Sequence, residues 1–135
     1  MLYLFGSGSY KNDRKILKVG FTDDMNIRTE QYYIYNPLGE IIETRDGDRI
    51  LEAKLHIRLD SYKVEFLDEW FYDEPGVKEI FSSDINDIDK WIWDNKSESL
   101  LSPNWPKKGT IKNKIFEELK SKFGCGSQIE GTKFI

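Results

Sequence analysis

Two short stretches at the start of the chain have the patterns of β-strands: the first is a short apolar run, and the second alternates between two sides, which is typical of a strand with one buried face. The first stretch covers residues 2–5, and the second covers residues 15–21, where Leu17, Val19 and Phe21 form the apolar side. The segment between them reads Gly-Ser-Gly-Ser-Tyr-Lys-Asn-Asp-Arg and is polar and rich in glycine. The pattern therefore predicts a β-hairpin with a long loop at its tip.

The spacing of apolar residues then changes to that of helices. The Thr-Asp-Asp sequence at residues 22–24 offers N-cap oxygens to a helix over residues 25–35. Asn36-Pro37 ends that helix, because the residue before a proline avoids helical backbone angles. The later predicted elements are a strand over residues 41–45, a helix over 49–59 capped by 46–48, an extended segment or strand over 63–73, a short helix over 77–81, an amphipathic helix over 85–95 and a closing helix from 111 that is capped by Gly124.

This order of elements predicts an α+β fold in which a small three-stranded antiparallel sheet is flanked by helices and followed by a C-terminal helical extension. The stretch over residues 97–110 contains prolines, serines and glycine and is interpreted as a linker. We therefore expect a domain over residues 1–96, the linker over 97–110, and a helix with a tail over 111–135.

The composition excludes several classes of site. Cys125 is the single cysteine of the 135 residues, which excludes an internal disulfide and a zinc site built from cysteines. One histidine, His56, excludes a histidine-rich metal centre. The sequence contains no apolar run near the roughly 20 residues of a membrane span and no signal-peptide pattern. We therefore expect no membrane association and a cytoplasmic protein, in the host cell cytoplasm if a phage or virus encodes it.

Charge is distributed unevenly along the chain. Residues 1–102 carry a net charge of −8 and residues 103–135 a net charge of +4, which together give the net charge of −4. An acidic body binds nucleic acid poorly by itself, because contacts to phosphates supply most of the non-specific affinity. The basic segment offers compensating cations at Lys107, Lys108, Lys112 and Lys114. The same charges also fit a solvated helix face, and both interpretations stay open.

Five short motifs follow one another in the first half of the chain. They are Tyr3 on the first strand, Lys18-Val19-Gly20 on the second, Arg28 eight residues later, Glu52 and His56 four residues apart on a helix, and Glu69-Trp70-Phe71. This ordered set resembles the GIY-YIG nuclease superfamily, and in particular its phage-type branch, over roughly residues 1–80. The resemblance implies an endonuclease associated with a phage or mobile element.

The superfamily cleaves phosphodiester bonds with one divalent metal ion. By resemblance, Tyr3 helps to activate the attacking water, Arg28 holds and neutralises the scissile phosphate, and Glu52 binds Mg²⁺ or Mn²⁺, which stabilises the leaving oxygen. This chemistry is sound physically, because a guanidinium and a metal ion place positive charge where negative charge develops. The resemblance also implies DNA as the substrate and a separate protein partner or domain that supplies sequence specificity.

The chain departs from the superfamily pattern at two positions. Lys18 replaces the second tyrosine of the name motif, as is usual in the phage-type branch, and we expect it to lower the pKa of the tyrosine or to contact phosphate. Tyr32 stands one helical turn after Arg28, where other branches often have a histidine. Gly20 belongs to the Lys-Val-Gly motif on which the resemblance rests, so it is a further possible site residue.

Each candidate also has a purely structural interpretation. Tyr3 fits a packing residue on a short strand, and Arg28 fits a surface pair with Asp24 at helical spacing. Glu52 and His56 fit an interacting pair on a solvated face, and we expect His56 to act through hydrogen bonds. Glu69 is interpreted first as a structural residue. Trp70 and Phe71 are interpreted as core residues.

Three functions of different classes remain in consideration. The first is a metal-dependent endonuclease acting on DNA. The second is a catalytically degenerate module of the same fold that binds protein or nucleic acid in a larger, for instance viral, assembly, with tryptophans that cover a partner surface (Trp91, Trp93, Trp105). The third is a DNA-binding regulator that reads DNA with its last helix, which requires one face exposing four lysines (Lys112, Lys114, Lys120, Lys122).

Overall fold

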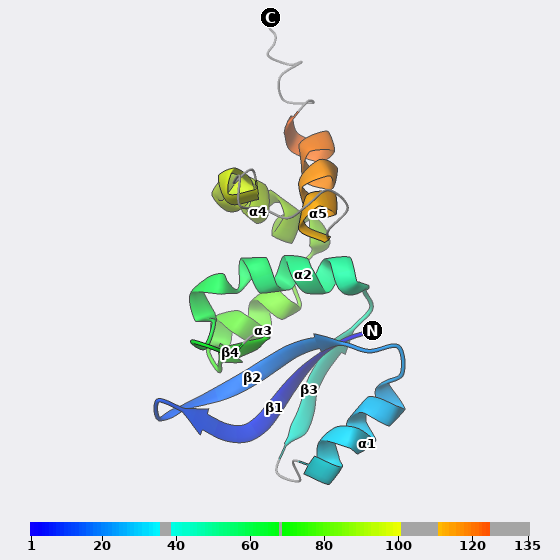
Figure 1. Ribbon diagram of the computed structural model, residues 1–135, viewed down its shortest axis with the longest axis vertical. Coiled ribbons are helices and arrows are strands. Elements are labelled where there is room, and N and C mark those ends of the chain that lie inside the picture. The colour runs from blue at the N-terminus through cyan, green and yellow to red at the C-terminus, as the bar shows by residue number, and fades with distance from the viewer. Residues whose placement is uncertain (36–38, 68, 101–110, 125–135) are drawn as a thin grey trace, which may run out of the picture. The chain divides into compact units, whose positions relative to one another are not determined.

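The computed structural model describes residues 1–35, 39–67, 69–100 and 111–124 (Figure 1). The chain divides into two compact units, Met1–Ser83 and Asp84–Ile135. The first unit is a mixed α and β structure, and the second is helical where it is described. The predicted α+β class is confirmed.

A four-stranded antiparallel sheet forms the centre of the first unit. Its strands are β1 (Leu2–Lys11), β2 (Arg14–Phe21), β3 (Glu40–Arg45) and β4 (Trp70–Tyr72), in the order β3-β1-β2-β4. The sheet thus has four strands where the sequence predicted three. The additional strand, β4, lies within residues 63–73, for which the sequence predicts an extended segment or a strand, and it is only three residues long. A strand this short is too brief to show an alternating pattern.

The first hairpin is longer and tighter than predicted. β1 continues through the Gly-Ser stretch to Lys11, so the expected long loop shrinks to a turn at Asn12 and Asp13. Both turn residues have positive φ, 53° and 63°, the geometry that matches the twist of a two-residue hairpin. The closing pairs Tyr10–Lys15 and Lys11–Arg14 therefore continue the ladder past residues of low strand propensity. A register irregularity between Gly6 and Tyr10 accommodates the change.

Helices cover both faces of this sheet (Figure 1). α1 (Met25–Tyr35) lies on one face, and α2 (Arg49–Arg58) and α3 (Pro75–Phe81) lie on the other. The predicted bounds of α1 are confirmed, and α2 ends one residue earlier than predicted. α3 begins at Pro75, two residues before the predicted start, because proline lacks an N–H group and suits the first helical position. A short 3₁₀ turn, η1 (Asp60–Tyr62), follows α2.

The core of the first unit is built mainly from aliphatic and aromatic residues of β1, β2, α2, β4 and α3. Its fully buried side chains include Leu2, Leu4, Val19, Leu55, Val64, Phe71, Val77 and Phe81. The burial of Phe71 confirms its assignment to the core, whereas Trp70 is half-buried. Because β1 and β2 contribute several of these buried side chains, packing holds the backbone of both strands in place.

The second unit contains α4 (Ile85–Leu100), α5 (Ile111–Leu119) and a π-helical turn, η2 (Lys120–Gly124). Ile88 and Ile92 of α4 are buried, as are Ile115 and Leu119 of α5. α4 is longer than predicted and continues over the first residues of the expected linker, of which residues 101–110 lie outside the described part of the chain. Among the described residues, no helix has the length and apolar character needed to cross a membrane.

Candidate functional site

Tyr3 and Gly20 are directly opposite each other on β1 and β2. The phenol ring of Tyr3 lies over the α-carbon of Gly20, so closely that a Cβ at residue 20 would lie 2.4 Å from the phenol oxygen. Tyr3 is only 1% exposed. The glycine of the Lys-Val-Gly motif is therefore required to leave room for the tyrosine.

Two residues of α1 approach the same phenol. The Tyr32 hydroxyl lies 2.6 Å from the Tyr3 hydroxyl, and the Tyr32 ring stacks on Phe5 with a centroid distance of 4.1 Å. Arg28 donates from Nη1 to the Tyr3 oxygen at 3.5 Å. Positions 28 and 32 are one turn apart, so both side chains leave the same face of the helix. Arg28 is therefore directed at Tyr3, and its alternative interpretation as a surface partner of Asp24 does not describe this geometry.

The cap predicted before α1 fixes the start of that helix. The Asp24 carboxylate accepts hydrogen bonds from the backbone N–H groups of Asn26 and Ile27 at 3.0 and 3.2 Å. Thr22 is buried, and its hydroxyl accepts a hydrogen bond from the N–H of Asp24. Capping bonds of this kind satisfy helix N–H groups that otherwise have no partner. The direction of Arg28 and Tyr32 thus follows from local sequence.

The Tyr3 phenol has a pKa raised well above its ordinary value of 10. Burial is the main cause, followed by the hydrogen bond with Tyr32, while Arg28 acts in the opposite direction. The sequence analysis expected Lys18 to lower the pKa of this tyrosine, but the pKa of Tyr3 is raised overall. Lys18 instead places its ammonium 5.5 Å from the centroid of the Tyr32 ring. At neutral pH the Tyr3 phenol is therefore protonated.

A second group forms around α2. Glu52 and His56 are one turn apart on this helix, which begins at the predicted cap, where the Asp48 carboxylate accepts a hydrogen bond from Leu51 N–H at 2.9 Å. Glu69 approaches them from the turn before β4. One potential ligand atom from each of Glu52, His56 and Glu69 lies within 4.8 Å of the others. Glu69, first interpreted as structural, thus joins the two predicted residues in one polar group.

This second group is tied to the outer edge of β2, just beyond the end of β4. The backbone N–H of Val19 donates to the carbonyl of Glu69 at 3.0 Å, and the Val19 carbonyl lies 2.9 Å from His56 Nε2. Because a carbonyl only accepts, Nε2 must carry the proton. Nδ1 then has the free lone pair, which can bind a cation or accept a proton.

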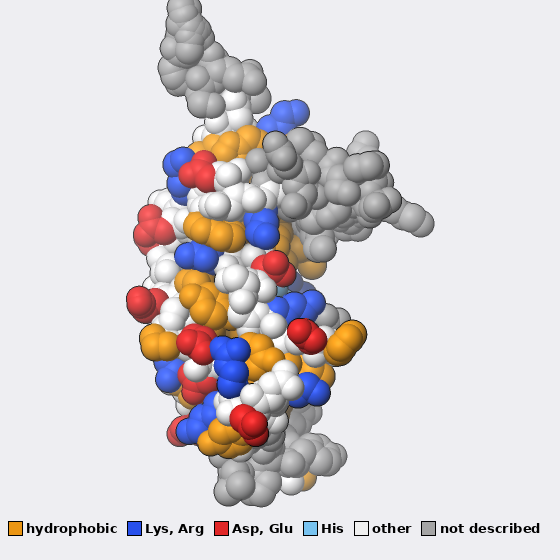
Figure 2. Space-filling model, turned by 90° about the vertical axis from the view of Figure 1, so that its left-hand side faces the viewer, with side chains coloured by type: hydrophobic (Ala, Val, Ile, Leu, Met, Phe, Trp, Pro, Cys, Tyr) orange, Lys and Arg blue, Asp and Glu red, His pale blue; other side chains and the backbone are white. Residues whose placement is uncertain are grey.

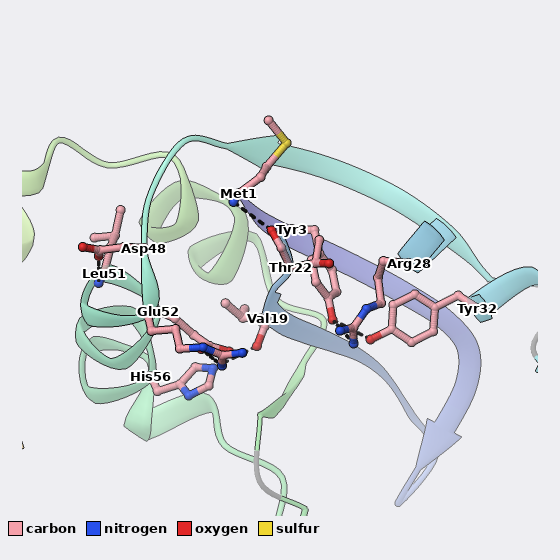
Figure 3. Close-up of polar contacts among 11 residues, drawn as sticks. Met1, Tyr3, Val19, Thr22, Arg28, Tyr32, Asp48, Leu51, Glu52 and His56 are labelled. Atoms are coloured by element: carbon pink, nitrogen blue, oxygen red, sulfur yellow. Dashed lines mark hydrogen bonds and ion pairs between the residues drawn. The ribbon is translucent and has the colours of Figure 1, made fainter. Parts of the chain in front are cut away.

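The two groups are neighbours along β2 (Figure 3). The Glu69 carboxylate raises the pKa of both Tyr3 and Glu52, so its charge acts on both groups. Burial is the main reason that the pKa of Glu52 is raised, and His56, Arg49 and Lys18 act in the opposite direction. Tyr3, Arg28 and Tyr32 thus lie on one side of Val19, and Glu52 and His56 lie on the other (Figure 3).

One cation at this site was missed in the sequence. Arg49 lies 3.9 Å from Glu52, measured between Nη1 and Oε1, and its guanidinium carbon is 4.8 Å from the centroid of the Phe21 ring. The signal that could have indicated it is the i,i+3 spacing from Glu52 on the predicted helix.

The predicted nucleic-acid-binding lysines lie in the second unit. Lys107 and Lys108 are outside the described residues, as is the side chain of Lys112, and Lys114 is exposed on α5. Lys122 donates to Asp89 at 2.6 Å and to Asn86 at 3.0 Å, so much of its charge is neutralised. Trp93 packs against Phe116 with a centroid distance of 6.1 Å, and Trp105 is outside the described residues. The contacts of Lys122 weaken the interpretation of the last helix as a DNA reader. The packing of Trp93 weakens the interpretation of this tryptophan as a cover for a partner surface.

The donors at the second group suit a divalent cation. Two carboxylates supply the oxygen ligands that Mg²⁺ and Mn²⁺ prefer, and an imidazole nitrogen is accepted more readily by Mn²⁺ than by Mg²⁺. The first group contributes a guanidinium and two hydroxyls. Positive charge and hydrogen-bond donors next to a cation site are what a phosphate group requires.

Comparison with protein families assigns the chain. The T5orf172 domain model matches residues 1–95, which include all residues of the site described above. Neither a curated protein nor a solved structure matches the chain. The chain therefore belongs to the T5orf172 domain family, a phage-type family of nuclease-like domains.

Proposed function

We propose that the protein is a metal-dependent endonuclease of the GIY-YIG type that hydrolyses phosphodiester bonds in DNA, in a phage or mobile-element setting. The observation that carries this proposal is the position of Glu69. Its carboxylate lies within 4.8 Å of ligand atoms of Glu52 and His56 and also acts on the pKa of Tyr3. The proposal assigns these carboxylates and the imidazole, together with the phenol and the guanidinium on the other side of Val19, to one bound phosphate (Figure 3).

Arg28 is the residue that binds the scissile phosphate in this proposal. Its guanidinium has planar, forked donors that match phosphate oxygens, and it keeps its charge at any relevant pH. Arg28 already points into the site through its contact with Tyr3. The positive charge therefore lies where negative charge develops during attack on phosphorus.

The two tyrosines orient the attacking water in this proposal. Since the pKa of Tyr3 is raised, its phenol stays protonated and acts as a hydrogen-bonding group, not as an ionised base. Tyr32 is half-buried and bonded to Tyr3, so it is the more exposed residue of the pair. A carboxylate oxygen of Glu52 or Glu69 that does not contact the ion proposed below can take up a proton.

Glu52, Glu69 and His56 would hold one Mg²⁺ or Mn²⁺ ion. When bound, such an ion supplies Lewis-acid stabilisation of charge on the phosphate and leaving oxygens. Burial already makes the ionised form of Glu52 costly, as its raised pKa indicates. A divalent cation next to Glu52 would stabilise its ionised form and so offset the cost of burial, which would explain why a half-buried position holds a carboxylate.

The surface drawn in Figure 2 supplies only part of the DNA affinity in this proposal. On the face drawn in Figure 2, Lys and Arg side chains of the described residues are interspersed with Asp and Glu. Because a mixed surface binds phosphates weakly, specificity and much of the affinity are assigned to the basic segment over residues 107–122 or to a separate protein partner.

The test is nicking of supercoiled plasmid DNA by the purified protein with Mn²⁺ or Mg²⁺. We expect nicked circles with metal and none with chelator. Arg28→Lys should lower the rate about 10²- to 10³-fold, as expected for loss of a charge-stabilising donor set. Arg14→Lys is the matched control, because Arg14 is bonded to Glu74 at 2.6 Å near the hairpin tip. Absence of nicking by the wild type would overturn the proposal.

A second candidate function is a module of the same fold that binds nucleic acid or protein without cleaving it. The near-complete burial of Tyr3 favours it, because a phenol that is 1% exposed offers little surface to a water molecule. Binding of DNA by a wild type that never cleaves, under any divalent cation, would support this second function.

A further inference from the structure

Arg49 is the first residue of α2 and lies beside the candidate metal group. Its guanidinium carbon is 4.8 Å from the centroid of the Phe21 ring, at the last position of β2. A planar guanidinium near an aromatic face is held by cation–π attraction, which reduces the freedom of an otherwise flexible side chain. The Phe21 ring of β2 therefore restricts the position of the Arg49 guanidinium before any ligand binds.

The pairing of Arg49 with Glu52 is loose. Their closest nitrogen and oxygen atoms are 3.9 Å apart, whereas Arg14 and Glu74 are 2.6 Å apart and Lys122 and Asp89 are also 2.6 Å apart. The Arg49 side chain is 66% exposed, while that of Glu52 is 13% exposed. The donors of Arg49 thus stay available in solvent next to a half-buried carboxylate.

Helix stability does not account for an arginine at this place. The first turn of a helix carries the positive end of its dipole, so a cation there is unfavourable. The helix start is already secured by Asp48, which accepts a hydrogen bond from Leu51 N–H. The arginine is therefore not explained by the helix dipole or by the cap, and its contacts in the fold are the Phe21 ring and the loose pair with Glu52.

We infer that Arg49 binds a phosphate of the DNA strand next to the one held by Arg28. This inference rests on the nucleic-acid substrate of the proposed function. Arg28 approaches the site from α1 beside Tyr3, and Arg49 approaches from α2 beside Glu52. In this inference the strand places its scissile phosphate between these groups and a neighbouring phosphate at Arg49. The residue thereby sets the path of the strand through the site.

The test is the salt dependence of binding to a fluorescently labelled DNA duplex, measured by anisotropy with Ca²⁺ in place of the catalytic ion. Removing one phosphate contact lowers the slope of log K against log salt by about 0.9 for duplex DNA. We therefore expect Arg49→Gln to lose about 0.9 of the slope and to bind about eightfold more weakly at 0.1 M salt. Arg49→Lys should retain the slope, because it keeps the charge.

Arg14→Gln is the matched control. Arg14 also stacks on an aromatic ring, with its guanidinium carbon 3.9 Å from the centroid of Tyr72, and it also pairs with a carboxylate. It lies at the hairpin end of β2, so its loss should leave the slope unchanged. Thermal unfolding of each variant separates a binding effect from a loss of fold.

The outcomes for this inference and for the nuclease proposal differ. If the wild type cleaves DNA and Arg49→Gln keeps both slope and affinity, the assignment of Arg49 is overturned and the nuclease proposal stands. If the wild type binds but never cleaves, and Arg49→Gln loses the slope, the phosphate contact is supported and the nuclease proposal is overturned. If the wild type does not bind DNA at all, both are overturned.

Discussion

The phenol oxygen of Tyr3 occupies the space that a side chain at Gly20 would need, with a separation of 2.4 Å from an ideal Cβ. The tyrosine and the glycine are register partners on adjacent strands, so neither can move without the other. The two motif residues, seventeen positions apart in the sequence, are therefore one structural unit.

Gly20→Ala should displace the Tyr3 ring and lower both stability and activity. Forcing a methyl group into a packed interior costs about 1–3 kcal/mol. We expect a loss of this size in urea unfolding and a large drop in nicking rate. Gly6→Ala is the control, since the one tight contact of its Cβ would be with the flexible end of Ile42, at 3.0 Å, and Leu17 would lie at an ordinary 3.6 Å. Equal effects of the two substitutions would contradict the account.

Tyr3→Phe should remove the hydroxyl contact with Tyr32 while the ring keeps its packing. We expect the rate to fall about 10²-fold and the stability to change by about 1 kcal/mol or less. The pKa of this phenol is raised above 10 in the folded protein. Its contribution to stability is therefore complete below pH 10 and is lost as the pH rises through the folded value.

The alkaline behaviour can be measured by absorbance of ionised tyrosine. In the wild type one tyrosine should resist ionisation longer than the others, and Tyr3→Phe should lack this late component. If all tyrosines of the wild type ionise together near pH 10 while the protein stays folded, the buried and bonded state of Tyr3 is wrong.

Glu52→Gln should abolish cleavage and yet stabilise the metal-free protein at neutral pH. Burial raises the pKa of Glu52 above 4.5, so ionisation of this side chain opposes folding. Its contribution to stability is present below pH 4.5 and is lost as the pH rises through the raised folded value. Glutamine carries no charge, so the variant should gain at pH 7 and match the wild type at pH 4.

Thermal unfolding with chelator at the two pH values measures this difference. The addition of Mn²⁺ should reverse the order at pH 7, because a bound ion stabilises only the protein that holds it. A variant less stable than the wild type at pH 7 without metal would be evidence against a costly carboxylate at residue 52.

His56→Gln should separate the two functions of the imidazole. The glutamine amide can still donate to the Val19 carbonyl, as Nε2 does at 2.9 Å, so stability should change by about 1 kcal/mol or less. The nitrogen ligand is lost, so the preference for Mn²⁺ over Mg²⁺ in the nicking assay should decrease. An unchanged ratio of Mn²⁺ to Mg²⁺ activity would show that His56 acts only through Val19.

Much of the site could be predicted from local sequence. The caps at Asp24 and Asp48 and the one-turn spacings of Arg28 with Tyr32 and of Glu52 with His56 determine helix starts and shared faces. These are short-range effects, so they can be recognised in a single sequence.

The remaining features depend on tertiary pairing. β1 runs through glycines and serines because the Asn12–Asp13 turn closes the hairpin and keeps the ladder in register. Glu69 reaches the site from a backbone with a φ of 69°, which no residue pattern signals for a non-glycine residue. The position of Arg49 beside Phe21 likewise depends on where α2 crosses the end of β2.

The central claim is that Tyr3, Arg28 and the Glu52 group act on one phosphate. The most direct measurement is a crystal structure with Mn²⁺ and a non-hydrolysable DNA strand, with the ion located by its anomalous signal. The account predicts one Mn²⁺ coordinated by Glu52 and Glu69, and a phosphate that contacts both this ion and Arg28. Manganese bound elsewhere, or a DNA backbone that lies away from Arg28, would contradict it.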